Sequence, residues 1–272
     1  MAKHNEWKKS KTIYWKDELH DDFDELGLTR PSVPQNYKYI RSNPINNFFS
    51  GILYHVIAVP VLYIYCFFHG IRVENKRHYR KIKRLGGFIY ANHVAISDVF
   101  KHQAMISFGK RINILGYSDT LSMPFVRNIC RGLGYLPLPL QGDNDNFKNL
   151  IEAMRYYVKE KRQAILIYPE AHIWPYYTKV RNFPSGSFTY PSKYHTPVVP
   201  IVTAWRKPIV GKKPKQTILV GNPIFPQENL STSENKEYLY NECLKAMKEM
   251  SESIKQYEYI KYINLLLFNM PL

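Results

Sequence analysis

The chain has 272 residues, of which 45% are apolar and 22% charged, a composition typical of globular proteins. This balance excludes a long disordered chain, a collagen-like repeat and a low-complexity architecture. The 38 Lys and Arg residues outnumber the 22 Asp and Glu residues, and the net charge of +16 calls for an anionic partner such as a membrane surface or a nucleic acid.

Three cysteines occur, and they lie far apart along the chain at Cys66, Cys130 and Cys243. Their odd number and wide spacing exclude a disulfide framework and a CxxC-type zinc site, and they suggest a reducing compartment. Residues 1–41 predict an irregular N-terminal arm with one short helix, because Pro31 and Pro34 interrupt regular structure. The first 16 residues have no apolar core, so we expect no signal peptide.

An apolar segment follows the arm. Residues 42–71 contain no Asp, Glu, Lys or Arg, and residues 48–68 are long enough to cross a hydrocarbon core of about 30 Å as a helix. Residues 72–84 contain seven Lys and Arg residues and a single acidic residue, Glu74. We predict a membrane-associated helical segment over 42–84 with its basic flank at the cytoplasmic face, bound to an anionic membrane surface.

Alternatives to a simple span stay open for this segment. Pro60 and the polar Ser50 and His55 are equally compatible with a kinked or re-entrant helix pair, or with a helix that lies in the membrane interface. A buried core helix with a solvated basic end is a further alternative.

From residue 85 onward, short apolar runs alternate with helical patterns. The runs predict strands at 87–90, 112–116, 134–139, 164–168, 198–204 and 217–220, and the 3.6-residue periodicity predicts helices at 99–108, 124–131 and 147–162. Ser231 and Glu234 have the spacing of a capping box at the start of another helix. This alternation predicts an α/β domain over 85–272, with a mainly parallel sheet flanked by helices.

The first candidate site residues follow the predicted strand 87–90. His93 lies just past the strand end, where open α/β sheets place their ligands, and its ordinary pKa of about 6.5 suits proton abstraction near neutral pH. Asp98 can hold and orient this imidazole only if His93 lies in a turn and Asp98 opens the next helix, because five residues of a regular helix would separate the two side chains by about 140°. Alternatively, Asp98 is a helix cap and His93 is structural.

The second candidate block follows the strand 164–168. In a parallel sheet Glu170 emerges at the same edge as His93, where it would bind substrate hydroxyls or brace His93. The alternative is a loop carboxylate paired with a surface Lys.

Together these blocks resemble the glycerolphosphate acyltransferase superfamily. The resemblance rests on Asn92-His93-x4-Asp98, on Tyr168-Pro169-Glu170 some 70 residues later, and on Val198-Val-Pro-Ile, and it covers about residues 87–204. The sequence is similar in particular to bacterial 1-acyl-sn-glycerol-3-phosphate acyltransferases. The family transfers an acyl group from acyl-CoA or acyl-carrier protein to a lysophospholipid hydroxyl. The resemblance therefore implies that this chain acylates 1-acyl-sn-glycerol 3-phosphate and makes phosphatidic acid. It implies no cofactor and no metal.

The resemblance also implies roles for single residues. His93 is the expected general base and Asp98 its orienting partner, with Asn92 and Glu170 expected to help bind the acceptor. The sequence departs from the family at Ala171-His172, where a small Gly-Thr pair is usual, and it lacks an arginine in residues 134–140, where the family grips the acceptor phosphate.

Lys179 and Arg181 are the residues we expect to supply that phosphate contact instead, and solvated loop charges are the alternative for both. Because of this departure the acceptor is open to another lysophospholipid or a glycolipid. A non-catalytic, basic membrane-binding protein is a separate hypothesis. Nucleic-acid binding is the weakest, because no basic-aromatic recognition motif occurs.

Overall fold

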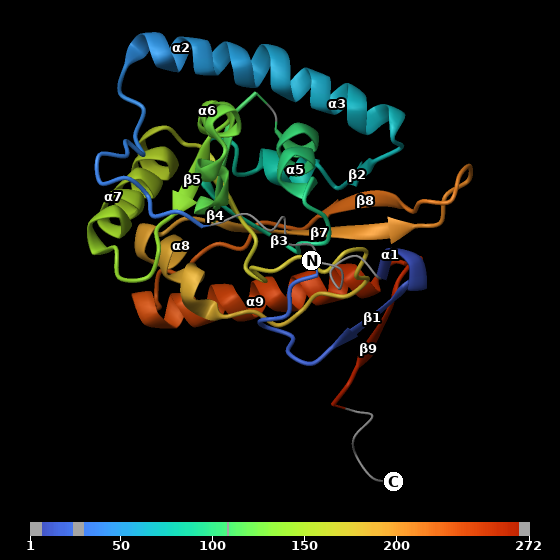
Figure 1. Cartoon of the computed structure of the whole chain (residues 1–272). Helices are drawn as coiled ribbons and strands as arrows, with labels where there is room; N and C mark the ends of the chain where they lie inside the picture. Colours follow the sequence, from blue (N-terminus) through green and yellow to red (C-terminus); the bar gives the residue numbers. More distant parts are fainter. Residues whose placement is uncertain (1–6, 24–29, 108, 267–272) are drawn as a thin grey trace.

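Seven strands form the central sheet, in the order β2-β8-β7-β3-β6-β4-β5 (Figure 1). The computed structural model describes residues 7–23, 30–107 and 109–266. The strands are β2 (Arg72–Glu74), β3 (Gly87–Ala91), β4 (Ile112–Tyr117), β5 (Tyr135–Leu138), β6 (Ala164–Ile167), β7 (Val198–Arg206) and β8 (Lys215–Val220). Neighbouring strands run parallel except β7 and β8, which are antiparallel. The predicted α/β fold with a mainly parallel sheet is confirmed.

The central strands are apolar at successive positions because both faces of the sheet are covered. Every residue of β3 and β6 is buried. Phe88 and Tyr90 belong to one core cluster together with Met154 and Met247, whereas Ile89 belongs to the other, together with Met105. Alternate residues of one strand therefore pack into different helical layers.

Helices cover the two faces in separate layers (Figure 1). On one face, α5 (Asp98–Ile106) and α6 (Pro124–Gly132) lie between the sheet and the long apolar helix, and on the other face lies α9 (Thr232–Glu252). The remaining helices of the domain are α4 (Arg77–Arg80), α7 (Asn144–Arg155) and α8 (Thr189–Tyr194). The capping box of α9 is confirmed, because Ser231 Oγ accepts from Glu234 N while the Glu234 carboxylate accepts from Ser231 N.

The apolar segment forms one helix over Pro44–Phe68, which contains an 18-residue stretch with a mean hydropathy of 1.9 and 11% of its residues buried. It consists of α2 (Pro44–Ile52), a π-helical turn (Leu53–Ala58) and α3 (Val59–Phe68). Proline lacks the N–H that an α-helical turn uses, and the widened turn ends at Ala58, two residues before Pro60. The proline is thus accommodated without breaking the helix into a pair.

This helix lies lengthwise against the α/β domain. Ser50, Tyr54 and Cys66 are its buried residues. The buried Arg111 guanidinium donates to Ser50 Oγ at 2.8 Å and to the Ser50 carbonyl at 2.7 Å, and Ile112 N donates to the Tyr54 hydroxyl at 3.0 Å. These bonds fix the helix to the domain surface along its first half.

The N-terminal arm is joined to the far end of the chain. After a short helix α1 (Trp7–Ser10), strand β1 (Thr12–Trp15) pairs in parallel with β9 (Lys261–Asn264) in a separate two-stranded sheet. Farther along the arm, the carbonyl of Asp21 accepts a hydrogen bond of 2.7 Å from the indole N–H of Trp174. The arm therefore reaches the loop that follows β6.

Candidate active site

Three parallel strands end at one edge of the sheet and deliver the polar residues of the site. Asn92 and His93 follow β3, Tyr168 and Glu170 follow β6, and Asp119 follows β4. The carboxyl ends of parallel strands form the usual ligand site of open α/β sheets. The sheet thereby brings together side chains that are about 25 to 80 positions apart in sequence.

His93 and Asp98 meet in the way their spacing requires. His93 lies in the irregular loop after β3, and Asp98 is the first residue of α5. The distance between His93 Nδ1 and Asp98 Oδ2 is 3.7 Å, and the His93 side chain is 13% exposed while that of Asp98 is 1% exposed. Nδ1 has no hydrogen-bond partner among the described residues, and it must approach the carboxylate by about 0.5–1 Å to form one.

The Asp98 carboxylate also shapes the loop that carries His93. Its Oδ2 accepts from Val94 N at 3.0 Å and from Ala95 N at 2.7 Å, and its Oδ1 accepts from Gln216 Nε2 at 3.0 Å. Burial alone would raise the pKa of Asp98, but the neighbouring His93, His102 and Lys101 side chains outweigh it, so the pKa lies below the usual range. Asp98 is therefore an anion at neutral pH.

Tyr168 forms the wall beside the His93 imidazole. The two rings stack with centroids 4.3 Å apart. The Tyr168 hydroxyl lies 2.8 Å from His102 Nδ1, and His102 Nε2 lies 2.8 Å from Thr203 Oγ1. This buried chain of contacts from β7 through α5 fixes the ring on which His93 packs.

Glu170 and Arg181 form a buried ion pair behind His93. Arg181 Nη2 lies 3.1 Å from Glu170 Oε2, and both side chains are at most 1% exposed. The same carboxylate accepts from His93 N at 3.2 Å and from Arg181 N at 3.0 Å, while the Arg181 guanidinium also donates to the carbonyls of His172 and Glu18. Burial raises the pKa of Glu170 and the Arg181 guanidinium opposes this rise. The pair holds the backbone of the His93 loop.

Two other predicted residues lie apart from the reacting groups. The amide of Asn92 donates to the Thr203 carbonyl at 3.1 Å and accepts from Thr203 N at 2.7 Å, which ties the loop after β3 to β7. Lys179 is exposed on the loop before Arg181. The cavity described next is not lined by any of the four predicted substrate-binding residues, which are Asn92, Glu170, Lys179 and Arg181.

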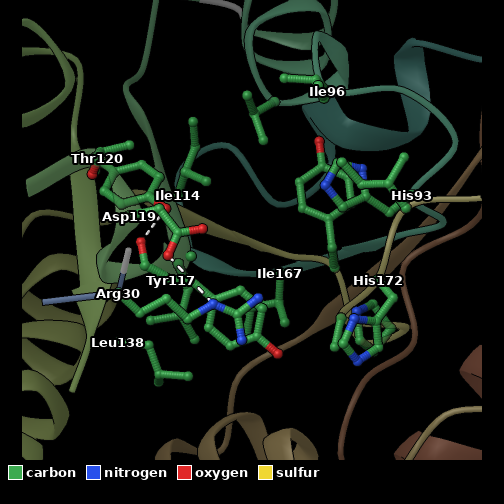
Figure 2. Close-up of a pocket in the computed structure, with 18 of the residues that line it drawn as sticks. Arg30, His93, Ile96, Ile114, Tyr117, Asp119, Thr120, Leu138, Ile167 and His172 are labelled. Atoms are coloured by element: carbon green, nitrogen blue, oxygen red, sulfur yellow. Dashed lines mark hydrogen bonds and ion pairs between the residues drawn. The ribbon is translucent and has the colours of Figure 1, made fainter. Parts of the chain in front are cut away.

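A largely apolar cavity of about 830 Å³ opens beside His93. Figure 2 shows His93 and His172 at one side and Arg30, Tyr117 and Asp119 at the other, with Ile167 between them and Ile114 and Leu138 on the side of Arg30. A cavity of this size and lining suits an aliphatic chain with a small number of polar anchor points.

Arg30 is the only Arg or Lys among the described residues that line this cavity. Its Nε lies 3.3 Å from Asp119 Oδ1, and its guanidinium lies over the Tyr117 ring at 3.8 Å (Figure 2). Asp22, also from the arm, lies 3.3 Å from His172 Nδ1. Arg30, Asp22 and Asp119 were not predicted as site residues from the sequence. Asp119 could have been, because it follows a predicted strand and the carboxyl ends of parallel strands form the ligand site.

With this geometry in view, comparison with known proteins identifies the family. The family model described as Acyltransferase matches residues 70–204, a stretch that holds both loops of the site and the strands from β2 into β7. The chain belongs to the glycerolphosphate acyltransferase superfamily. A crystal structure of the 1-acyl-sn-glycerophosphate (LPA) acyltransferase PlsC from Thermotoga maritima matches with a TM-score of 0.54 and 15% identity, over 77% of this chain and 89% of that chain.

This identity is low, so the match to PlsC shows a shared fold. No curated protein sequence matches the chain. Among the described residues of this acyltransferase, no group of three or more His, Cys, Asp or Glu side chains is placed to hold a metal ion. The acyltransferase fold and the edge of its sheet were thus both indicated by the sequence motifs.

Proposed function

We propose that this acyltransferase moves a fatty acyl group from a thioester donor to the free hydroxyl of a 1-acyl-sn-glycerol 3-phosphate-type lysophospholipid, with His93 as the general base. The observation that carries the proposal is the His93–Asp98 pair at the mouth of an apolar cavity. Acyl-CoA and acyl-carrier protein are both suitable donors.

The reaction follows from the chemistry of these groups. His93 removes the proton from the acceptor hydroxyl as its oxygen attacks the thioester carbonyl, and the anionic Asp98 stabilises the imidazolium that forms. When the tetrahedral intermediate collapses, the carbon–sulfur bond breaks and the imidazolium returns the proton to the leaving thiolate. The products are an ester and a free thiol, and no acyl-enzyme forms.

The remaining site residues have supporting roles in this proposal. The Glu170–Arg181 pair and Asn92 hold the loop that carries His93, because their polar atoms contact the backbone. Arg30 is better placed than Lys179 to meet an anionic headgroup, since Arg30 lines the cavity.

A second acceptor class is favoured by the charged side chains that line the cavity. Asp22 and Asp119 line the same cavity as Arg30, so carboxylates outnumber the guanidinium there. A headgroup with both a phosphate and an amine would match this arrangement, because the phosphate pairs with Arg30 and the amine with a carboxylate. Lysophospholipids with amine-bearing headgroups are therefore the alternative acceptors.

The proposed location is the cytoplasmic face of a membrane. The outward face of the helix Pro44–Phe68 carries Ile45, Phe48, Phe49, Val56, Ile57, Val61, Ile64, Phe67 and Phe68, each more than half exposed. Because the opposite face is bonded to the α/β domain, the orientation that we propose is in the plane of the interface, with the outward face in the acyl chains.

The experiment is a thiol-release assay with acyl-CoA and purified protein in mixed micelles, over a panel of lyso-lipids. We expect thiol release that depends on a lyso-lipid and yields the diacyl product. Faster acylation of 1-acyl-sn-glycerol 3-phosphate would indicate the first acceptor class, and faster acylation of a lysophospholipid with an amine-bearing headgroup would indicate the second. Acceptor-independent release, or none with either acyl-CoA or acyl-carrier protein, would refute the proposal and favour a non-catalytic membrane-binding protein.

A further inference from the structure

The turn between β7 and β8 carries two large apolar side chains into solvent. Residues 207–214 connect these antiparallel strands, and Ile209 and Val210 at the tip are 92% and 83% exposed. A single exposed apolar residue is common on a protein surface, but here two β-branched residues are adjacent on a hairpin that projects from the sheet (Figure 1). Nothing in the reaction described above uses them.

The backbone of this hairpin tip is restricted. Pro208 directly precedes the apolar pair and Pro214 closes the turn, and each proline ring fixes its own φ near −65°. Between them Gly211 has a φ of 87°, in the left-handed region that glycine adopts most readily. A tip that is ordered in advance loses little conformational entropy when it binds a partner.

Basic residues surround the apolar pair. Residues 206–215 contain five Lys and Arg residues and no Asp or Glu. Lys207, Lys212 and Lys213 are exposed, and none of them makes an ion pair among the described residues. An apolar tip among unpaired cations matches the surface of an anionic bilayer, which offers acyl chains below a layer of negative charge.

The base of the hairpin is joined to the end of the apolar helix. Gly70 lies two residues after this helix ends at Phe68, and its carbonyl accepts from Arg206 Nη2 at 2.7 Å. Strand β2 follows and pairs with β8, with Arg72 opposite Thr217. In Figure 1 the hairpin bends at its tip toward the side of the sheet on which the helix lies. The hairpin is therefore continuous with the exposed end of the helix.

Other partners would use only half of this surface. A nucleic acid would pair with the lysines but leave Ile209 and Val210 in water, because neither has a ring on which a base can stack. A second copy of the chain would bring the same net charge of +16 and repel the lysines. An anionic bilayer accommodates both the apolar pair and the cations.

We propose that the tip of the β7–β8 hairpin is a second membrane contact, in which Ile209 and Val210 enter the acyl chains of an anionic bilayer and the lysines bind its headgroups. The inference rests on the proposed interfacial orientation of the helix Pro44–Phe68 and adds a contact from the α/β domain. Strand β8 also carries Gln216, whose amide donates to Asp98 at 3.0 Å. A hairpin held in the bilayer thus fixes the position of the catalytic sheet edge relative to the lipid.

A fluorescent label tests insertion of the tip directly. The three native cysteines are buried, so a thiol-reactive NBD dye attached to a Val210→Cys variant labels the tip selectively. On vesicles of equal parts phosphatidylcholine and phosphatidylglycerol we expect its emission to shift to shorter wavelength. The same dye on Leu266→Cys, an exposed position after β9 on the other side of the central sheet, should not shift. An unshifted dye at position 210 on vesicle-bound protein would overturn the inference.

Vesicle affinity tests the apolar pair without a label. For Ile209→Ser/Val210→Ser we expect a Kd for the same vesicles that is about tenfold higher or more, because two apolar side chains no longer enter the lipid. Leu19→Ser/Leu266→Ser, at exposed leucines that follow β1 and β9, is the matched control and should bind like the wild type. If the hairpin variant binds like its control, or differs from it only in molar mass in solution, the tip is not a membrane contact.

The lysines have their own matched pair of variants. Lys207→Gln/Lys212→Gln should also raise the Kd by about tenfold, and its vesicle binding should depend less on salt than that of the wild type. Lys148→Gln/Lys245→Gln, on α7 and α9, removes the same charge from exposed positions elsewhere and should keep the wild-type Kd. Equal loss in both variants would show that only the net charge matters, and would contradict a contact at the hairpin.

The same measurements distinguish failure of the inference from failure of the proposed function. Acylation of a lyso-lipid together with an unshifted dye at position 210 leaves the function intact and overturns the second contact. A shifted dye with no lyso-lipid acylated keeps the contact and overturns the function. Absence of vesicle binding by the wild type overturns both the helix orientation and the hairpin contact.

Discussion

Ala171 explains at the scale of one residue why the family favours glycine after the Pro-Glu pair. Its φ of 62° is in the left-handed region, which an L-residue with a Cβ enters at a cost of about 1–2 kcal/mol. The turn is fixed by hydrogen bonds from Ala171 N to the Tyr168 carbonyl and from His172 N to the Glu170 carbonyl. The strain therefore lies directly beside the Glu170–Arg181 pair.

Substitution of this residue by glycine should relieve the strain. For Ala171→Gly we expect a free energy of unfolding raised by roughly 0.5–1 kcal/mol, because the relief exceeds the extra entropy that glycine gains in the unfolded chain. Chemical denaturation of wild type and variant gives the comparison, and acyl transfer should be retained. A less stable Gly variant would contradict the backbone conformation of this turn.

His102 predicts a pH dependence of stability. Burial lowers its pKa from 6.5 to about 4, so the folded chain binds fewer protons than the unfolded chain between these values. The free energy of unfolding should therefore fall by up to about 3 kcal/mol as pH drops from 6.5 toward 4, and the stabilisation is fully present above 6.5.

The His102→Gln variant isolates this contribution. Glutamine keeps a donor and an acceptor for Tyr168 and Thr203 but has no proton to bind, so the variant should lose stability less steeply with acid than the wild type. Denaturation curves at several pH values between 7 and 4.5 measure both slopes. Equal slopes would show that His102 does not take up a proton on unfolding.

At the scale of elements, the apolar helix Pro44–Phe68 has two different faces. Its inward face is fixed by Arg111 and Tyr54, whereas Phe67 and Phe68 at its end are 71% and 78% exposed. Basic residues of β2 and α4 follow directly, and Arg72, Arg77 and Arg80 among them are exposed. An apolar face beside exposed arginines is the arrangement of an interfacial helix on an anionic membrane.

The double variant Phe67→Ser/Phe68→Ser tests this face. Loss of two buried aromatic rings from the lipid should weaken binding to anionic vesicles by at least about tenfold, with little change in the free energy of unfolding. Phe225→Ser, at an exposed Phe elsewhere, is the matched control in vesicle flotation. If both variants float like the wild type, the outward face is not the membrane contact.

The same scale shows what the sequence could predict and why. Strands such as β3 and β6 were predictable because a parallel sheet covered on both faces needs unbroken apolar runs, and their carboxyl ends then had to bring His93, Asp98 and Glu170 to one edge. The orientation of the apolar helix was not predictable, because it depends on hydrogen bonds between Ser50 and Arg111 that no local pattern records.

At the scale of the whole molecule, the N-terminal arm completes the site. Arg30 and Asp22 line the main cavity, and β1 of the same arm pairs with β9 near the other end of the chain. Contacts over such separations leave no periodic signal, so the sequence indicated only an irregular arm. Arg181 was predicted to contact the acceptor phosphate, but in the folded chain its side chain is buried against Glu170. This pairing joins two loop positions and leaves no periodic signal in the sequence either.

The central claim is that His93 and Asp98 act together as the base in thioester-dependent acyl transfer. The most direct measurement is the single-turnover rate of acyl transfer by His93→Ala and Asp98→Asn, with His20→Ala at an exposed histidine as control. We predict a rate lower by about 10²–10⁴ for His93→Ala and a clear loss for Asp98→Asn, with membrane binding and folding retained and the control unaffected. Transfer by His93→Ala at the wild-type rate would contradict the account.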